Sequence, residues 1–471
     1  MIEGLKESMN KLSCDVLVVG AGIAGWTAAT VAAQNGSNVV LLDKSLGALG
    51  DGNTLMTSGS LNAVGKNPRT DPDTLYEAVM SEGVANPELA RAWANHCARA
   101  VEWLTSCGIS MSQNQSGSIR LEPETEISLS PVYRKEVGTN ILLKIKKRFL
   151  DSGGRYLNGF EGRKLLGDKR RIGGVLGEKD EEELEFRSRS TVIATGGFSA
   201  NQEMVREYIG ANALQCKLRG AKSCTGDGLR MALAVGAKAV NIKYFYGHLL
   251  SLKAITDDRF WPYPRLDPLV NEGILVDHKG HRIVDEGRGD VAVANELARS
   301  DDVRRSSLIF DREAWGHARA DSNSKLPQTP AANPWLEDND GYLYRCETIP
   351  QLADALEVDR LTLTQTLETL NRAIQSGQNL AALPIPRTGA LRLLQPPLYG
   401  LRVVPGITFT MGGVLINGQA QVLDLAERPI PGLYAAGDAI GGLMGGHRGG
   451  YAGGLAQAVV TGILAGKTAS G

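Results

Sequence analysis

CDVLVVGAGIAGWTAATVAAQNGSNVVLLDK, residues 14–44, decides the fold of this chain. Residues 16–19 are apolar and mostly β-branched, which is typical of a strand buried on both faces. The turn that follows reads G-x-G-x-x-G: Gly20 permits the tight turn, Gly22 lets the backbone approach a pyrophosphate, and Gly25 lets the helix pack closely on the strand. The positive N-terminus of that helix then faces the phosphates. The segment predicts a strand–turn–helix unit that binds a dinucleotide.

A second strand, residues 38–42, ends in Asp43. An acid at this point accepts hydrogen bonds from both ribose hydroxyls and repels a 2′-phosphate. Strand, turn, helix, strand and acid therefore fall in register, which a chance glycine turn would not show. Around this turn we expect the following residues to contact the dinucleotide: Gly20, Gly22, Ile23, Ala24, Gly25, Asp43 and Lys44.

The bulk composition excludes several classes of protein. The 471 residues are enough for two domains, and the net charge of -1 gives no general attraction for nucleic acid or an anionic membrane. No apolar run reaches the roughly 18 residues of a membrane span, and the polar N-terminus MIEGLKESMNKLS does not resemble a secretory signal. The six cysteines lack metal-ligand spacing, so we expect no metal site and reduced thiols in a cytoplasmic enzyme.

Other glycine-rich segments repeat the pattern of a strand followed by a turn. Residues 45–65 are rich in Gly, Ser, Asn and Thr and can present amides and hydroxyls to a cofactor, although an ordinary surface loop would have the same composition. Strand and glycine-turn segments also occur at residues 190–205 and 431–442, a third glycine turn opens into a helix at residues 224–237, and a glycine-dense helix ends the chain. From these segments we expect further cofactor contacts from Asn53, Thr54, Ser58, Gly59, Thr195, Gly196, Gly197, Asp227, Gly437, Asp438, Gly454 and Leu455.

Residues 241–400 differ in character, with more aromatic residues and prolines and one long polar helix. From residue 401 the pattern of apolar strands and glycine turns returns. We therefore predict an α/β fold in which residues 1–240 and 401–471 form a discontinuous Rossmann-like domain and residues 241–400 form an inserted domain.

Six segments, in order, carry a resemblance to a known family: GAGIAGWTAA, GNTLMTSGSLNA, VIATGGFSANQEM, TGDGLRMALAVGA, TMGGVLIN and IPGLYAAGDAIGG. With them the chain resembles the fumarate reductase/succinate dehydrogenase flavoproteins, whose relatives include 3-ketosteroid dehydrogenases, tricarballylate dehydrogenase and urocanate reductase. The resemblance implies FAD in the Rossmann-like domain and an α+β capping domain that closes over the isoalloxazine. It also implies that Asp438 holds the ribityl chain and that the terminal helix faces the flavin N1/O2 edge.

Members of this family that bind FAD covalently carry a linking histidine before the Ser/Gly run. Residues 52–54 are Gly-Asn-Thr here, so the resemblance implies non-covalent FAD.

On the substrate side the resemblance is partial. Relative to fumarate reductases, His248 lies at the expected 23 positions after the threonine of TGDG, and Arg448 provides a C-terminal arginine in a shifted glycine context. Leu269 stands where the family has its proton-donating arginine, and Phe409 falls in the place of a histidine. Two polar anchors for a dicarboxylate are thereby lost, and fumarate is not the expected substrate.

We consider several roles for the polar residues that remain. Arg448 with His248 is the candidate oxyanion clamp, and Tyr451 or Arg265 is the candidate for proton transfer. His248 could instead be a hydrogen-bonded core histidine, and Tyr451 could be a packing residue. The aromatic residues Phe260, Trp261 and Tyr263 could line the pocket or form the core of the capping domain, and we favour the core.

The expected function is an FAD-dependent oxidoreductase that transfers a hydride between flavin N5 and a C–C/C=C bond next to a carbonyl or carboxylate. The expected substrate is a small molecule with one such head group. A single dinucleotide fingerprint and the lack of a C-x-x-C-H haem motif imply a separate electron donor or acceptor, which could be a protein, a quinone or oxygen. Two alternatives remain open: an amine or amino-acid oxidase, and a flavin-binding assembly or regulatory protein whose active site has decayed.

Overall fold

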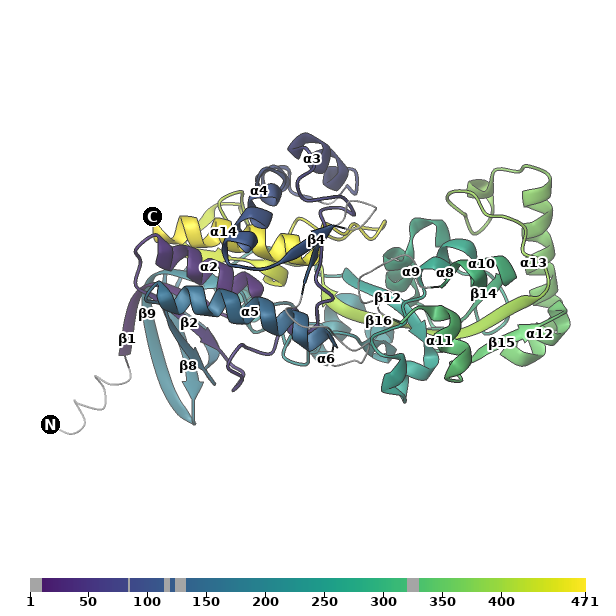
Figure 1. Ribbon diagram of the computed structural model, residues 1–471, viewed down its shortest axis with the longest axis horizontal. Coiled ribbons are helices and arrows are strands. Elements are labelled where there is room, and N and C mark those ends of the chain that lie inside the picture. Colours follow the sequence, from purple (N-terminus) through teal and green to yellow (C-terminus); the bar gives the residue numbers. More distant parts are fainter. Residues whose placement is uncertain (1–10, 84, 114–118, 123–132, 320–329) are drawn as a thin grey trace.

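The computed structural model describes residues 11–83, 85–113, 119–122, 133–319 and 330–471, which form two lobes side by side (Figure 1). The first lobe contains the glycine turns and the C-terminal helix, and the second is built from the middle of the chain. Within the described residues, eight strands form the main sheet of the first lobe and six form that of the second. The predicted α/β class is confirmed.

The first lobe is organised around strand β1, which lies inside a parallel sheet. Strands β19, β9, β1, β2 and β6 are adjacent in that order and parallel, while β18, β8 and β7 add antiparallel pairs. Residues 16–19 are at most 4% exposed, as their apolar, β-branched character predicts. The strands are β1 Lys11–Val19, β2 Val39–Asp43, β6 Arg155–Asn158, β7 Glu161–Asp168, β8 Arg171–Lys179, β9 Glu182–Ile193, β18 Gln421–Leu423 and β19 Pro429–Ala435.

The helices that cover this sheet pack unusually closely. Helix α2 (Ile23–Gln34) starts directly after the glycine turn and packs against the terminal helix α14 (Gly454–Ser470). A Cβ at Gly462 of α14 would lie 2.7 Å from a backbone oxygen of α2, and one at Gly466 would lie 2.4 Å from another. The glycines of the terminal helix therefore allow the two backbones to approach. The remaining helices here are α3 Pro72–Met80, α4 Pro87–Ser106, α5 Tyr133–Asp151, α6 Gln202–Met204 and α7 Asp227–Ala234.

A substitution at Gly25 would test the tight contact between the glycine turn and helix α2. A Cβ at this position would lie 1.8 Å from the carbonyl oxygen of Gly20, a backbone atom that cannot rotate away. Gly25→Ala is therefore expected to lower the free energy of unfolding by about 1–3 kcal/mol, measured by chemical denaturation. Gly316→Ala is the matched control, because a Cβ there meets nothing within 4 Å. Equal stability of the two variants would contradict this packing.

The second lobe is organised around one long strand, β16 (Leu398–Thr410), which pairs with four other strands. Its sheet takes in residues 217–410 and so extends on both sides of the expected 241–400. The reach of β16 places residues 406–410 beside the first lobe, where the two lobes meet (Figure 1). The other strands are β10 Lys217–Leu218, β12 Phe245–Ser251, β13 Ile274–Val276, β14 Ser307–Asp311 and β15 Leu343–Cys346.

Short helices cover the second sheet. Helix α9 packs on β12, and helices α12 and α13 enclose a separate apolar cluster against β15 and β16. These helices are α8 Asp267–Glu272, α9 Asp290–Leu297, α10 Arg312–His317, α11 Ala332–Asp338, α12 Ile349–Leu356 and α13 Arg360–Gln375. Two three-stranded sheets complete the described fold: β3 Ser60–Leu61, β5 Ile119–Leu121 and β4 Met111–Gln113, and β11 Ala239–Val240, β17 Gly413–Leu415 and β20 Ile440–Gly441.

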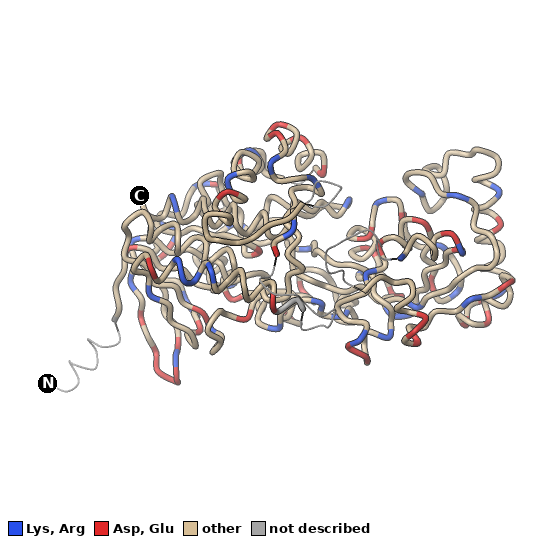
Figure 2. Tube along the Cα trace, in the orientation of Figure 1, with Lys and Arg blue, Asp and Glu red and all other residues tan. Residues whose placement is uncertain are grey.

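Charged residues of both signs are interspersed over both lobes (Figure 2). This distribution agrees with the net charge of -1. Of the helices in the described residues, none is both long and apolar enough to cross a bilayer.

Candidate active site

A cavity lies where the lobes meet, between the glycine turns of the first lobe and strands β12 and β16 of the second. Most of the residues predicted from the glycine-rich segments line it. They are Gly20, Gly22, Ile23, Ala24, Asp43, Lys44, Asn53, Thr54, Ser58, Thr195, Gly196, Asp227, Gly437, Asp438, Gly454 and Leu455.

At one end of the cavity the glycine turn is held by the carboxylate of Asp43. One oxygen of Asp43 accepts from the amide of Ala21 at 2.7 Å, and the other accepts from the amide of Ser45 at 2.9 Å. Gly20 has φ +107°, and its amide donates to the carbonyl of Leu42 at 2.7 Å. The turn therefore follows from the paired carboxyl ends of β1 and β2, and it directs the start of α2 into the cavity.

Lys44 and Asp227 form an ion pair beside this turn. The Lys44 ammonium lies 2.7 Å from the Asp227 carboxylate and also contacts the Thr225 hydroxyl. Burial acts to raise the pKa of Asp227, but the bonds from Lys44, Thr225 and Arg230 hold it below its usual value. The charge of Lys44 is thus already balanced by the protein.

Asn53 joins the two lobes at the middle of the cavity. Its amide oxygen accepts from the amide of Ala221 at 2.7 Å, and its amide nitrogen donates to the carbonyl of Thr408 at 3.3 Å. It also approaches the carboxyl of Asp438. Burial raises the pKa of Asp438 to about 7, and the hydrogen bond from Asn53 opposes that rise.

At the other end the cavity is walled by aromatic rings. Tyr246 of β12 stacks on Tyr451 with a ring-centroid distance of 4.2 Å and on Phe409 of β16 at 5.0 Å. The Tyr451 hydroxyl accepts from the amide of Gly454, the first residue of α14, at 2.9 Å. Burial raises the pKa of both tyrosines, so each hydroxyl keeps its proton at neutral pH. Tyr451 can therefore accept one hydrogen bond and donate another.

Arg265 brings a positive charge to this end of the cavity. Its side chain is 40% exposed and pairs with Asp267 at 3.3 Å. Burial favours the neutral guanidine, but the facing Asp267 carboxylate raises the pKa of Arg265 above its ordinary value. Arg265 remains a cation.

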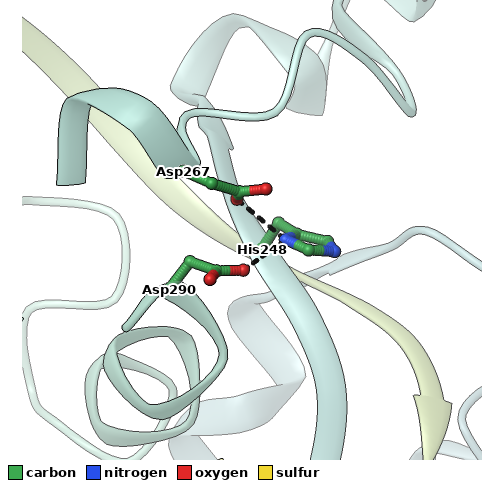
Figure 3. A group of neighbouring side chains, drawn as sticks. All are labelled: His248, Asp267 and Asp290. Atoms are coloured by element: carbon green, nitrogen blue, oxygen red, sulfur yellow. Dashed lines mark hydrogen bonds and ion pairs between the residues drawn. The ribbon is translucent and has the colours of Figure 1, made fainter. Parts of the chain in front are cut away.

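His248, Asp267 and Asp290 form a group of contacting side chains (Figure 3), and Asp267 of this group also pairs with Arg265. His248 Nδ1 is 2.8 Å from Asp267 and 2.6 Å from Asp290, the first residues of α8 and α9. Burial acts to raise the pKa of Asp267, yet His248 and Arg265 hold it below its usual value. The three ligand atoms lie within 4.8 Å of one another, close enough to hold a metal ion, but they already contact each other directly. We interpret them as a hydrogen-bond network that fixes Asp267 against Arg265.

Two residues expected to form the oxyanion clamp do not reach the cavity. His248 is 2% exposed and lies behind Arg265 and Asp267. Arg448 is exposed in a loop closed by a bridge between Gly445 and Gly450, and it is not among the residues that line the cavity. In this structure the clamp of Arg448 with His248 is therefore not formed, and we do not retain it. Of the candidate acid–base groups, Tyr451 and Arg265 do line the cavity.

Three predicted cofactor glycines serve packing instead of lining the cavity. A Cβ added at Gly25 would lie 1.8 Å from the carbonyl oxygen of Gly20. At Gly59 it would lie 2.7 Å from the carbonyl oxygen of Leu121, and at Gly197 it would lie 2.0 Å from the hydroxyl of Thr410. Each lets the backbone of one cavity-forming segment approach its neighbour.

Several residues of the cavity wall were not assigned to it from the sequence, and three of them matter most for the substrate end. Tyr246 lies two residues before His248 on β12, so strand alternation places both on one face and could have identified it. For Tyr263 we favoured the core over a pocket-lining role, but only Phe260 is fully buried, and Tyr263 lines the cavity. Arg219 follows the two-residue strand β10, too short a segment to recognise from the sequence pattern.

The parallel sheet, the glycine turn and the cavity define a flavin-binding protein with a Rossmann-like lobe. The chain belongs to the family described as FAD binding domain, whose sequence profile matches residues 15–455. Its cofactor is FAD, and the resemblance to the fumarate reductase flavoproteins is confirmed.

Two curated proteins and one solved structure illustrate what this chain is similar to. It is 29% identical over 451 residues to a probable fumarate reductase, Ifc3, of Shewanella frigidimarina, covering 91% of this chain and 70% of that protein. It is 29% identical over 454 residues to the urocanate reductase of Eggerthella lenta, with the same coverage. The open conformation of a flavocytochrome c3 fumarate reductase superposes with a TM-score of 0.67 at 26% identity, covering 100% of this chain and 80% of that one.

The residues of the cavity fit FAD. A Cβ at Gly22 would meet only the Thr54 hydroxyl, at 3.7 Å, so glycine leaves space open at the start of α2. The Thr195 hydroxyl lines the cavity and is buried without a hydrogen-bond partner among the described residues. Asp438 offers a partly buried carboxyl. An open helix start suits a pyrophosphate, and unpaired polar groups suit the hydroxyls of a ribityl chain.

The raised pKa of Asp438 makes the stability of FAD-free protein depend on pH. Its folded pKa of about 7 exceeds the ordinary 3.8 of the unfolded chain, so the folded state binds a proton that the unfolded state releases. This stabilisation is present at low pH and is lost as the pH rises through 7. We expect the melting temperature of FAD-free protein to fall from pH 6 to pH 8, and to fall less in Asp438→Asn. An identical pH profile in the variant would assign the change to other groups.

Proposed function

We propose that this protein is an FAD-dependent oxidoreductase acting on a C–C/C=C bond next to a carbonyl or carboxylate, with a substrate other than fumarate. The observation that supports this most is that one cavity combines the FAD-fitting residues with Tyr246, Arg265 and Tyr451. When bound, FAD supplies the hydride chemistry at N5. The chain must then orient the bond, hold the polar head and move one proton.

Tyr451 and Arg265 are the residues we assign to the reacting end. The Tyr451 hydroxyl accepts from the Gly454 amide, which leaves its proton to donate to a substrate oxygen as charge develops there. Arg265 holds a positive charge in the same cavity and is the candidate for handling the proton at Cα. His248 acts through Asp267 as a positioning residue, because it has no surface on the cavity.

Two positions at which this chain has an apolar residue in place of a polar residue of fumarate reductases support a substrate without a second carboxylate. Phe409 lines the cavity with an apolar ring, and Leu269 is fully buried on α8. Neither can neutralise a buried carboxylate, and an unpaired buried carboxylate is strongly unfavourable.

The electron partner and the location complete the proposal. We propose a separate donor or acceptor, which could be a protein, a quinone or oxygen, since the chain carries one dinucleotide fingerprint. We place the protein in the cytoplasm, because all six cysteines are free thiols.

Anaerobic photoreduction tests this function. FAD-loaded protein is reduced by light and then mixed with enoates, enones, fumarate or imines, and reoxidation is followed by flavin absorbance. Fast reoxidation by a mono-acid enoate or an enone supports the proposal. Preference for fumarate would refute the argument from Phe409 and Leu269. Oxidation of amines by the oxidised protein would favour an amine oxidase, and inertness toward every compound would favour a decayed site.

FAD is expected to be released intact when the protein is denatured with acid. No histidine among the described residues lines the cavity, and Asn53 and Thr54 occupy the loop where covalent relatives carry the linking residue. The measurement is the flavin absorbance of supernatant and pellet after precipitation. Flavin that stays with the polypeptide would contradict non-covalent binding.

A further inference from the structure

Among the residues that the structure describes, three cationic side chains line the cavity, and one of these three has no negative partner there. Lys44 pairs with Asp227 at 2.7 Å, and Arg265 pairs with Asp267 at 3.3 Å. Arg219 forms no ion pair with any residue that the structure describes, although it is only 7% exposed. A buried guanidinium without a counter-ion is strongly unfavourable, so it is a site that an anionic ligand would neutralise.

The protein holds Arg219 in a fixed position without neutralising it. Its Nε donates to the carbonyl of Pro262 at 2.9 Å, and one Nη donates to the Thr408 hydroxyl at 2.7 Å. Both acceptors are neutral. The guanidinium is therefore oriented before a ligand arrives, which is how arginines that recognise carboxylates are arranged.

The surroundings of Arg219 belong to the substrate end of the cavity. Its guanidinium carbon lies 5.1 Å from the centre of the Tyr263 ring, and that of Arg265 lies 5.8 Å from the same ring. Both cations act on the Tyr246 hydroxyl. Two like charges thus face one aromatic wall, and an anion placed there would relieve the repulsion between them.

From this arrangement we propose that Arg219 is the residue that binds the carboxylate of the substrate, and that the substrate is a planar enoate with a ring and a single carboxylate. The inference rests on the proposed function for the reaction itself, but it concerns binding. One uncompensated cation calls for one carboxylate. The stacked rings of Tyr246, Phe409 and Tyr451 favour a flat unsaturated body over a second charged group.

Binding to the oxidised FAD-loaded protein tests the inference separately from catalysis, because oxidised flavin cannot reduce an enoate. The probes are trans-cinnamate, its neutral amide, crotonate (the acid without the ring) and fumarate (a second carboxylate in place of the ring). Calorimetry or the change in flavin absorbance gives each dissociation constant. We expect trans-cinnamate to bind about 10- to 100-fold more tightly than each of the others.

Variants identify the residue. Arg219→Gln is expected to weaken trans-cinnamate binding by about 10- to 100-fold and to leave binding of the amide unchanged. Arg219→Lys should retain part of the affinity, since it keeps the charge but not the fork of donors. Lys222→Gln is the matched control: it removes an exposed positive charge three residues away that does not line the cavity.

The outcomes separate this inference from the proposed function. Equal affinity of wild-type protein for trans-cinnamate and its amide would overturn the anion site, even if Arg219→Gln failed to fold. Loss of FAD from folded Arg219→Gln would also overturn it, because the cofactor would then be the anion that Arg219 neutralises. Binding that depends on Arg219 without any reoxidation by enoates would instead sink the proposed function and keep the anion site. If Arg219→Gln reduced enoates with unchanged KM and kcat, the anion site would be overturned and the proposed function would stand.

Discussion

Arg265→Gln is expected to lower turnover by about 10²-fold or more while the purified protein keeps its full content of FAD. Arg265 lines the cavity as a cation, and Asp267 fixes it from behind at 3.3 Å. The substitution removes a charged donor from the place where charge develops and a proton must move. It also leaves Asp267 paired with His248 alone. The measurement is kcat with the best substrate from the photoreduction screen, with flavin absorbance as the check on FAD content.

Arg259→Gln is the matched control for this prediction. Arg259 is on the same segment, is exposed, and pairs with Asp257 at 2.7 Å outside the cavity. Its loss should leave kcat within about twofold, as for a surface ion pair of little energetic weight. If FAD-loaded Arg265→Gln kept wild-type kcat, the proton would have to be handled elsewhere, and Tyr451 would be the next candidate. A loss of flavin in Arg265→Gln would show a structural role instead.

The cofactor half of the site could be predicted from the sequence because local rules determine it. A buried strand, the turn at Gly20 and Gly22 and the acid Asp43 occupy fixed positions within one short segment. The glycine turns after residues 193 and 435 likewise follow strands, β9 and β19, and most residues predicted from the glycine-rich segments line the cavity. Three glycines predicted to contact the cofactor do not line the cavity, for a general reason. A sequence does not distinguish a glycine that faces a ligand from one that faces a backbone oxygen, as Gly25 does.

The substrate half could not be predicted because it depends on how distant segments meet. Counting from a motif placed Leu269 at the position of the family's arginine, and Leu269 is buried on α8 while Arg265, just before that helix, reaches the cavity. Arg448 matched by position in the chain, yet it is exposed and does not line the cavity. Whether a polar side chain faces the cavity is set by tertiary packing, which a spacing rule does not contain.

Asp43→Ala is expected to weaken FAD binding by about 2–4 kcal/mol, or roughly 30- to 800-fold in Kd. A carboxylate has about four acceptor positions, and the structure uses two of them, for the amides of Ala21 and Ser45. The remaining capacity faces the cavity, where the hydroxyls of a ribose would be accepted. The measurement is Kd for FAD after removal and titration of the cofactor, together with kcat at saturating FAD, which should change much less.

Because Asp43 also supports the turn, the test must separate a lost ligand contact from a weakened scaffold. Asp43→Asn keeps one acceptor oxygen and the shape of the side chain, so its loss of affinity should be intermediate. Asp15→Ala is the matched control, since Asp15 accepts from the Asn38 amide at 2.9 Å between the same two strands, at the end away from the cavity. It should cost stability without weakening FAD binding. If Asp15→Ala weakened FAD binding as much as Asp43→Ala does, the effect would come from the pairing of β1 with β2, and Asp43 would not be the ribose ligand.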